Sequence, residues 1–185
     1  MNQQRIQLLE QQSRAYCEGT IEYINNEWIF FDDETDEASG LEDYANREII
    51  VYRSNRVKRG ILLGNGLVQT KHERLPLHDQ DRIKIKKILS FSLEALLDDL
   101  NDDAFFQFIT TLNSLQFSIY DYLYCHNYLS FLLDKVKQGV NFLIFDNGTE
   151  ICAVQHHFCY AEKKTDRFEY TLNSGRRIII EKLPS

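Results

Sequence analysis

The chain has 185 residues with a mass of 21.9 kDa, a net charge of −7 and 43% hydrophobic residues. Enough apolar side chains are present for a packed core, which excludes an intrinsically disordered chain. The sequence shows neither an apolar secretion signal near its start nor an uncharged apolar stretch long enough to span a membrane. The four cysteines are therefore expected to be reduced thiols in the cytoplasm.

Short strands are predicted in the first part of the chain, after a brief amphipathic helix over residues 4–14. Residues 16–31 alternate in polarity on both sides of Asn25-Asn26, which predicts a β-hairpin. The residues that follow, 32–43, are rich in Asp and Glu and are expected to form a mobile acidic loop. Further strands are predicted between residues 47 and 70, with a turn at Gly64-Asn65-Gly66.

The hairpin of residues 16–31, with the acidic loop after it, resembles the opening strands of SH3-like barrels over less than a third of the chain. This resemblance implies a small antiparallel β-barrel. About five short strands joined by short turns are also typical of such a fold. We therefore expect residues 1–75 to form a short helix plus a small barrel.

Helices are predicted after Pro76, because apolar residues then recur mostly at steps of three and four. The first covers residues 83–100. A second is expected to begin near Asn101 or Asp102, whose side chains can accept hydrogen bonds from the amides of the first turn. Residues 115–136 are predicted to be a third helix or a continuation of the second. These helices are expected to pack antiparallel.

Strand patterns return at residue 141, and short turns divide the remaining sequence into four strands that predict an antiparallel meander. The expected fold class is thus α+β. It combines a small SH3-like barrel, central antiparallel helices and a four-stranded antiparallel meander at the C-terminal end. Residues 76–185 are expected to form the second domain, unless the whole chain is one continuous domain.

Thiol and imidazole groups are concentrated on one predicted strand, which raises the hypothesis of a zinc site. On an extended strand Cys152 and His156 share one face about 13 Å apart, whereas His157 and Cys159 share the other. A complete site would need ligands from another segment. The weak candidates for such a site are His157, Cys159, Cys125 and His126. No catalytic residue is assigned and no cofactor is predicted, because no recognised motif surrounds the cysteines or the histidines.

Basic residues gather between residues 53 and 87 despite the negative net charge. Such a cluster can bind an acidic protein surface or the phosphates of a nucleic acid, although it is also typical of a solvated face. The candidate binding residues are Arg53, Arg56, Lys58, Arg59, Lys84, Lys86 and Lys87.

These observations predict a non-catalytic cytosolic protein with an interaction or regulatory role. Its expected partner is another protein or a second copy of the chain, and no membrane partner is predicted. Two alternatives remain open at this point. One is a nucleic-acid-binding protein that uses the basic segment 53–87, and the other is a thiol- or metal-dependent enzyme that uses the Cys and His residues.

Overall fold

A computed structural model describes residues 3–53, 56–133 and 135–181. The chain divides into two compact units, one of Ala15–Lys87 and one of Met1–Arg14 with Ile88–Ser185. We call the first the β unit and the second the αβ unit. Strands account for 48% of the described residues, so the protein is mostly β and the predicted α+β class is wrong.

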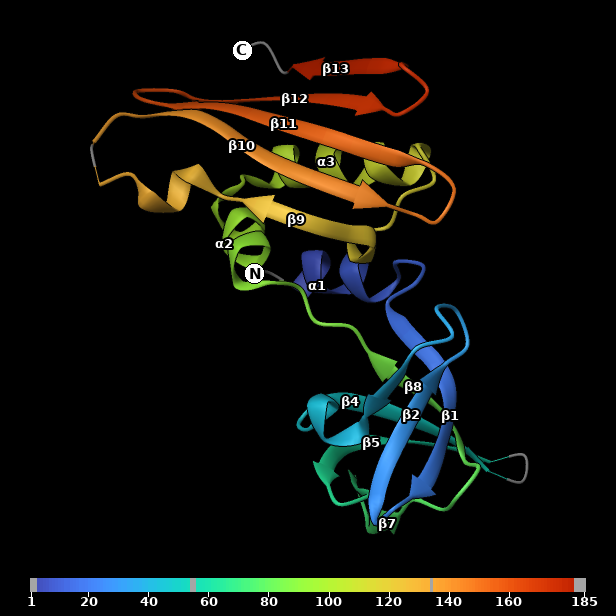
Figure 1. Cartoon of the computed structure of the whole chain (residues 1–185). Helices are drawn as coiled ribbons and strands as arrows, with labels where there is room; N and C mark the ends of the chain where they lie inside the picture. Colours follow the sequence, from blue (N-terminus) through green and yellow to red (C-terminus); the bar gives the residue numbers. More distant parts are fainter. Residues whose placement is uncertain (1–2, 54–55, 134, 182–185) are drawn as a thin grey trace. The chain divides into compact units, whose positions relative to one another are not determined.

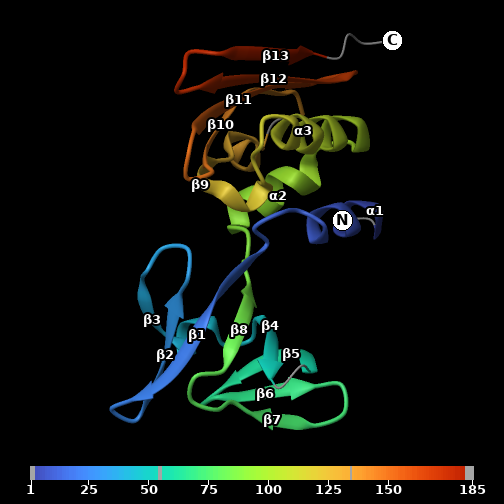
Figure 2. The ribbon, with the colours of Figure 1, turned by 90° about the vertical axis from the view of Figure 1, so that its right-hand side faces the viewer.

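The β unit is one eight-stranded antiparallel sheet with the strand order β3-β2-β1-β8-β4-β5-β6-β7 (Figures 1 and 2). A short 3-10 helix, η1 (Leu41–Tyr44), follows β3. The strands are β1 (Tyr16–Ile24), β2 (Glu27–Asp32), β3 (Ala38–Gly40), β4 (Glu48–Arg53), β5 (Arg56–Gly64), β6 (Leu67–Thr70), β7 (Arg74–Pro76) and β8 (Arg82–Lys86).

Strand β8 lies in the middle of this sheet, between β1 and β4. Its Ile83 and Ile85 side chains are fully buried, whereas Arg82, Lys84 and Lys86 lie on the opposite face. The helix predicted from residue 83 onward is therefore wrong over this stretch. Burial of every second residue between two neighbouring strands stabilises the extended conformation, whatever the spacing of the later leucines.

The SH3-like barrel predicted for residues 1–75 is also wrong. The sheet has eight strands, and within the described residues its end strands β3 and β7 do not pair with each other, so the sheet does not close into a barrel. The prediction missed β3 and β7, which have three residues each and are too short to show a pattern. It also missed β8, which supplies the buried core residues Ile83 and Ile85.

The acidic segment is more ordered than the predicted mobile loop. Strand β3 pairs with β2, and η1 begins at the next residue. Leu41 is 1% exposed and belongs to the core of the β unit, together with Phe30 and Leu62. Residues 38–43 therefore lie in a short strand and a 3-10 helix, and the expectation of a loop is wrong there.

The αβ unit contains a five-stranded antiparallel sheet with the order β13-β12-β11-β10-β9 (Figure 1). The four predicted strands pair consecutively, but β9 adds a fifth, so the predicted number of strands is wrong. The strands are β9 (Tyr122–His126), β10 (Lys137–Asp146), β11 (Ile151–Tyr160), β12 (Lys164–Leu172) and β13 (Arg177–Glu181). The helices are α1 (Gln3–Glu10), α2 (Phe91–Asp99), α3 (Asp102–Ser114), and the 3-10 helices η2 (Ile119–Asp121) and η3 (Tyr128–Phe131).

Both α2 and α3 begin at a side-chain cap. Ser90 Oγ accepts a hydrogen bond from the backbone N–H of Leu93, and Asn101 Oδ1 accepts one from Ala104. These bonds satisfy amides of the first turn, which lack partners within the helix. The predicted start of the second helix at Asn101 is confirmed.

The core of the αβ unit lies between α3 and one face of the sheet (Figure 2). Phe108 of α3 stacks on Phe168 of β12 with ring centroids 5.2 Å apart, and lies 6.2 Å from Phe145 of β10. Helix α2 contacts β9 and η3 instead. The antiparallel packing predicted for the helices stays a prediction. Each helix buries its apolar side against the strands.

The third helix predicted over residues 115–136 is replaced by η2, β9 and η3. Tyr120, Leu123 and Leu129 suggested one helical stripe. In the structure Tyr120 and Leu129 are buried by the two 3-10 turns, whereas Leu123 is 65% exposed on the edge strand. The helical pattern failed because its apolar residues are divided between the core and the surface.

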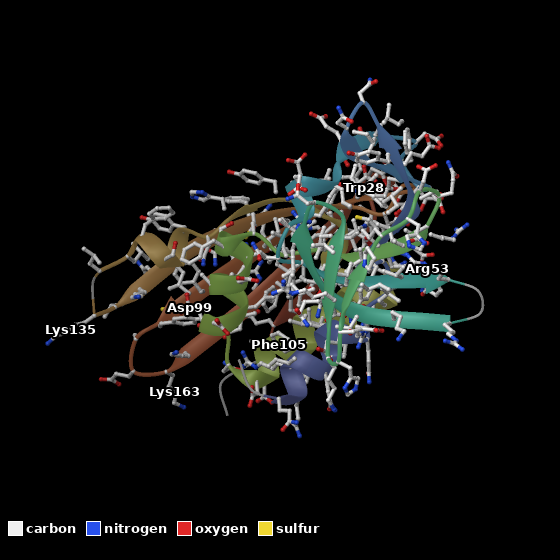
Figure 3. The ribbon with its side chains drawn as sticks, turned by 90° about the horizontal axis from the view of Figure 1, so that it is seen from below. Trp28, Arg53, Asp99, Phe105, Lys135 and Lys163 are labelled. Atoms are coloured by element: carbon white, nitrogen blue, oxygen red, sulfur yellow. The ribbon has the colours of Figure 1, made fainter. Side chains whose placement is uncertain are left out.

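Helix α1 is anchored by a buried arginine. Arg5 donates to Asp102 Oδ1 at 2.7 Å and to the backbone carbonyls of Leu97 and Leu100, at the C-terminal end of α2. Its guanidinium also lies 4.6 Å from the ring centre of Phe105, which Figure 3 labels. Among the residues described, no helix is long and apolar enough to cross a membrane.

Candidate functional site

A pocket in the β unit combines a defined shape with recognisable chemistry. Its volume is about 360 Å³. Three segments that are distant in sequence supply it: the β1–β2 hairpin, the β3–η1 segment and the β5–β6 turn. The lining residues are Tyr23, Asn26, Glu27, Trp28, Gly40, Glu42 and Asn65.

Two tight turns form the rim of this pocket. Asn25 and Asn26 have φ values of 51° and 67°, and Asn65 and Gly66 have values of 49° and 67°. Two successive residues with positive φ are typical of the turns that match the twist of a two-residue β-hairpin, and Asn and Gly adopt them at low cost. Both turns were predicted from the sequence and both are confirmed.

Trp28 and Tyr23 form an aromatic wall. The two residues are cross-strand partners on β1 and β2, with ring centroids 5.0 Å apart and planes at 52°. Gly66 lies against the indole, because a Cβ at this position would be 2.3 Å from Trp28 Nε1. The absence of a side chain at Gly66 therefore sets the position of Trp28, which Figure 3 labels.

Glu42 supplies a carboxylate next to this wall. Its Oε1 accepts a hydrogen bond from the backbone N–H of Asn65, and its Oε2 would lie 2.8 Å from a Cβ on Gly64. Glu27 adds a second carboxylate, and the described lining contains no lysine or arginine. Aromatic faces attract cations through the ring quadrupole, and carboxylates attract them directly. The chemistry of the pocket therefore favours a positively charged group.

The predicted cationic residues lie elsewhere on the β unit, and several are paired with carboxylates. Arg53, labelled in Figure 3, donates from Nε and Nη2 to both carboxylate oxygens of Asp81, and this hydrogen bonding raises the pKa of Arg53. Lys58 Nζ lies 2.8 Å from Glu73 Oε1. Arg56 is exposed opposite Arg53 at the start of β5.

Three more of the predicted cationic residues are in ion pairs. Lys86, the remaining one, lies at the end of β8. The pairs are Arg59–Glu48, Lys84–Glu18 and Lys87–Glu34. The basic segment is thus interleaved with carboxylates from neighbouring strands. It forms local ion pairs rather than one continuous cationic face.

The Cys and His candidates for a metal site do not converge. His157 and Cys159 lie on the outer face of β11, whereas Cys125 pairs with Leu143 on the helix-covered face, and burial raises its pKa to about 11. His126 is on the outer face of β9, with β10 between it and His157. In the described part of the chain, no group of three or more His, Cys, Asp or Glu side chains could hold a metal ion.

His157 instead contacts a carboxylate on the outer face of the sheet. Its Nε2 lies 3.6 Å from Glu169 Oε1, and Arg167 and Arg177 donate to the two oxygens of Glu169. The hydrogen bond from Arg177 lowers the pKa of Glu169. This charged carboxylate therefore links side chains of β11, β12 and β13.

His156, on the opposite face of β11, is the centre of a buried polar network. Asp166 Oδ1 accepts a hydrogen bond from Tyr160 at 2.7 Å and lies 2.8 Å from His156 Nε2, and its Oδ2 accepts one from Asn101 at 3.1 Å. His156 Nδ1 lies 3.1 Å from Asn141 Nδ2. The imidazole is 0% exposed.

The partners of His156 define its tautomer. Asn141 Oδ1 accepts from the backbone N–H of Leu129, so its Nδ2 faces His156 Nδ1 as a donor. The imidazole proton therefore lies on Nε2 and is donated to Asp166. Burial and the bond to this carboxylate raise the pKa of Tyr160. Because the imidazole has no exposed surface and both of its nitrogens have partners, we interpret the network as structural.

Comparison with known proteins shows which family this chain belongs to. Residues 3–182 match the family described as "Protein of unknown function (DUF2777)". The chain belongs to this family. It is also 38% identical over 109 residues to "Uncharacterized protein YisN" of Bacillus subtilis (strain 168). That match covers 58% of this chain and 56% of the relative, little more than half of its length. No solved structure matches at a significant level.

The family match extends across both units and includes the pocket, whose residues the sequence reasoning missed. One signal was available: residues placed symmetrically about a two-residue turn pair directly, so Tyr23 and Trp28 could have been predicted to meet. No comparable signal existed for Glu42. Its place in the pocket depends on η1 and on the β5–β6 turn, which are far apart in sequence from the hairpin.

Proposed function

We propose that this chain is a non-catalytic interaction protein whose β unit binds a positively charged side chain of a protein partner. The observation that carries this proposal is the wall of Trp28 and Tyr23 beside the carboxylate of Glu42. No nucleophile paired with a base lines this pocket as described, which supports binding rather than catalysis.

An arginine side chain suits the pocket best. A guanidinium is planar, stacks on aromatic rings and can pair with a carboxylate through two parallel hydrogen bonds. A cation–π contact contributes about 0.5–2 kcal/mol, and an exposed ion pair about 0–1 kcal/mol. A single arginine is thus expected to bind with a Kd of about 10 mM or higher, and flanking contacts of a longer partner would raise the affinity.

The charged side chains of the β unit give less support to a nucleic acid partner. A phosphate backbone needs cations that are free to pair with it, whereas many of the basic residues of segment 53–87 are already paired with carboxylates. The pocket itself is lined by Glu27 and Glu42, which would repel phosphate. The observed charges therefore favour a cationic group of a protein.

The chain contains a single tryptophan, so its fluorescence reports on the pocket directly. We would titrate the protein with two capped pentapeptides, Gly-Gly-Arg-Gly-Gly and Gly-Gly-Gln-Gly-Gly. The arginine peptide should change Trp28 emission saturably, and the glutamine peptide should not. Glu42→Gln should weaken binding up to about fivefold, because it removes the paired charge, whose contribution is about 1 kcal/mol at most. Glu162→Gln, which removes an exposed carboxylate of the αβ unit, is the matched control.

Equal responses to the two peptides, or unchanged arginine binding by Glu42→Gln, would contradict the proposal. A single-stranded oligonucleotide serves as a competitor. Salt-sensitive oligonucleotide binding that Glu42→Gln leaves intact, in the absence of arginine binding, would favour the nucleic-acid alternative instead.

A further inference from the structure

Strand β13 (Arg177–Glu181) is an edge strand that pairs on one side only. In the described sheet β12 is its one neighbour, and the opposite edge is open (Figures 1 and 2). An open edge exposes backbone N–H and C=O groups that can pair with another strand. The exposure extends to a large apolar side chain, because Ile179 at the centre of the strand is 51% exposed.

The direction of the backbone groups follows from the turn before β13. Arg176 O accepts a hydrogen bond from Leu172 N at 2.9 Å, so the backbone groups of residue 176 face β12. In an antiparallel pair these groups alternate from one side to the other along the strand. The N–H and C=O groups of Ile178 and Ile180 therefore face β12, and those of Arg177, Ile179 and Glu181 face the open edge.

The sequence of β13 is complementary to itself in the antiparallel direction. It reads Arg-Ile-Ile-Ile-Glu, with Ile179 at its centre. Two copies placed about a twofold axis at Ile179 bring Arg177 of each chain opposite Glu181 of the second copy. Ile178 then lies opposite Ile180, and the two Ile179 side chains lie side by side on the outer face. Opposite charges and paired β-branched residues are both stabilising cross-strand pairs.

We propose that β13 pairs antiparallel with β13 of a second copy of this chain, so that two five-stranded sheets join into one continuous sheet. The pairing would form about six backbone hydrogen bonds, all from groups that the open edge presents. Each Arg177 lies between Glu169 of its own chain and Glu181 of the second copy, so the charged cluster of the outer face continues across the junction.

The other edge of this sheet is less suited to the same role. Strand β9 has a register shift where it pairs with β10, between Ile144 and Phe145, and a bulge of this kind bends an edge away from further pairing. Its sequence, Tyr-Leu-Tyr-Cys-His, has no charged pair that would match in the antiparallel direction. The charge complementarity of β13 thus points to a second copy at that edge.

The test is the oligomeric state of the full chain, measured by sedimentation equilibrium. Wild type should reach a dimer. Ile179→Lys places two ammonium groups side by side at the axis and should raise the dimer Kd at least about 100-fold. Ile179→Glu should do the same. An equimolar mixture of the two variants should dimerise again, because the facing charges are then opposite. Gln138→Lys, at an exposed position on β10, which β11 and β12 separate from β13, is the control and should dimerise like wild type.

A backbone variant makes the test independent of charge. Ile179→Pro removes an N–H that faces the open edge and leaves the bonds to β12 in place, so the fold should persist while the dimer is lost. Circular dichroism checks the fold of each variant. A monomeric wild type at high micromolar concentration would overturn the proposal. So would a dimer that persists in both Ile179→Lys and Ile179→Pro, because its interface would then lie elsewhere.

Discussion

Replacement of Asp166 by asparagine should lower the free energy of unfolding of the αβ unit by about 4 kcal/mol. The carboxylate of Asp166 accepts hydrogen bonds from three donors, His156, Tyr160 and Asn101, and is 6% exposed. An asparagine of the same shape has one acceptor oxygen and one NH₂ group. In either orientation of the amide, this NH₂ group faces a donor.

The magnitude follows from the groups that lose a partner. Loss of a hydrogen bond to a charged acceptor costs about 1.5–3 kcal/mol, and a buried donor left without an acceptor costs about 1–3 kcal/mol. Asn101 cannot offer a replacement acceptor, because its Oδ1 already caps α3 through Ala104. A loss of about 4 kcal/mol is a large part of the 5–15 kcal/mol typical of a folded domain, and corresponds to a midpoint shift of about 2 M urea.

The assay is hydrogen–deuterium exchange in increasing urea, read by mass spectrometry on peptides from β11 and β12. Peptides from β1 and β2 report on the β unit and serve as the internal reference. Glu162→Gln removes one exposed carboxylate near the same strands and should change the stability by less than about 0.5 kcal/mol. The reasoning is refuted if Asp166→Asn costs less than about 1 kcal/mol, or if its effect equals that of Glu162→Gln.

Burial raises the pKa of Cys125 and Cys152 to about 11, so only about a thousandth of each thiol is ionised at pH 8. Ellman's reagent should therefore modify both cysteines far more slowly in the native protein than in the urea-unfolded protein. Peptide mapping can measure the two rates. Because these pKa values are raised on folding, the stabilisation is complete below about pH 8.5 and should decrease as the pH rises toward 11; native-state labelling at the unfolded rate would contradict this. Gly66→Ala should lower the free energy of unfolding by at least about 2 kcal/mol and shift Trp28 emission. The φ of 67° at this position disfavours alanine, and the new Cβ would collide with the indole. An unchanged thermal midpoint and an unchanged spectrum would contradict this prediction.

Features that depend on a few neighbouring residues were predictable. The turns at Asn25-Asn26 and Asn65-Gly66 follow from the ease with which Asn and Gly adopt positive φ. The start of α3 follows from the ability of the Asn101 side chain to accept a hydrogen bond from a first-turn amide. In each case the residue that carries the signal also makes the stabilising contact, so no distant segment is needed.

Features that depend on a distant segment were missed or wrong. The stretch from Ile83 has apolar spacings that suit a helix or a strand, and only the neighbouring strands β1 and β4 select the strand. The apolar residues of 115–136 likewise gave a helical pattern, although β10 draws part of that segment into the sheet as β9. Short apolar runs are ambiguous because periodicity does not say what will lie against them.

The sequence alone was sufficient for a packed protein, its tight hairpin turns, the cap of α3 and the succession of strands at the C-terminal end. Tertiary structure decided that the N-terminal strands form an open eight-stranded sheet, that Cys125 and His157 stay apart, and that Glu42 meets Trp28 in one pocket. The physical reason is that turns and caps are stabilised within a few residues. A pocket or a sheet is stabilised by contacts between segments, and a linear pattern does not specify those pairings.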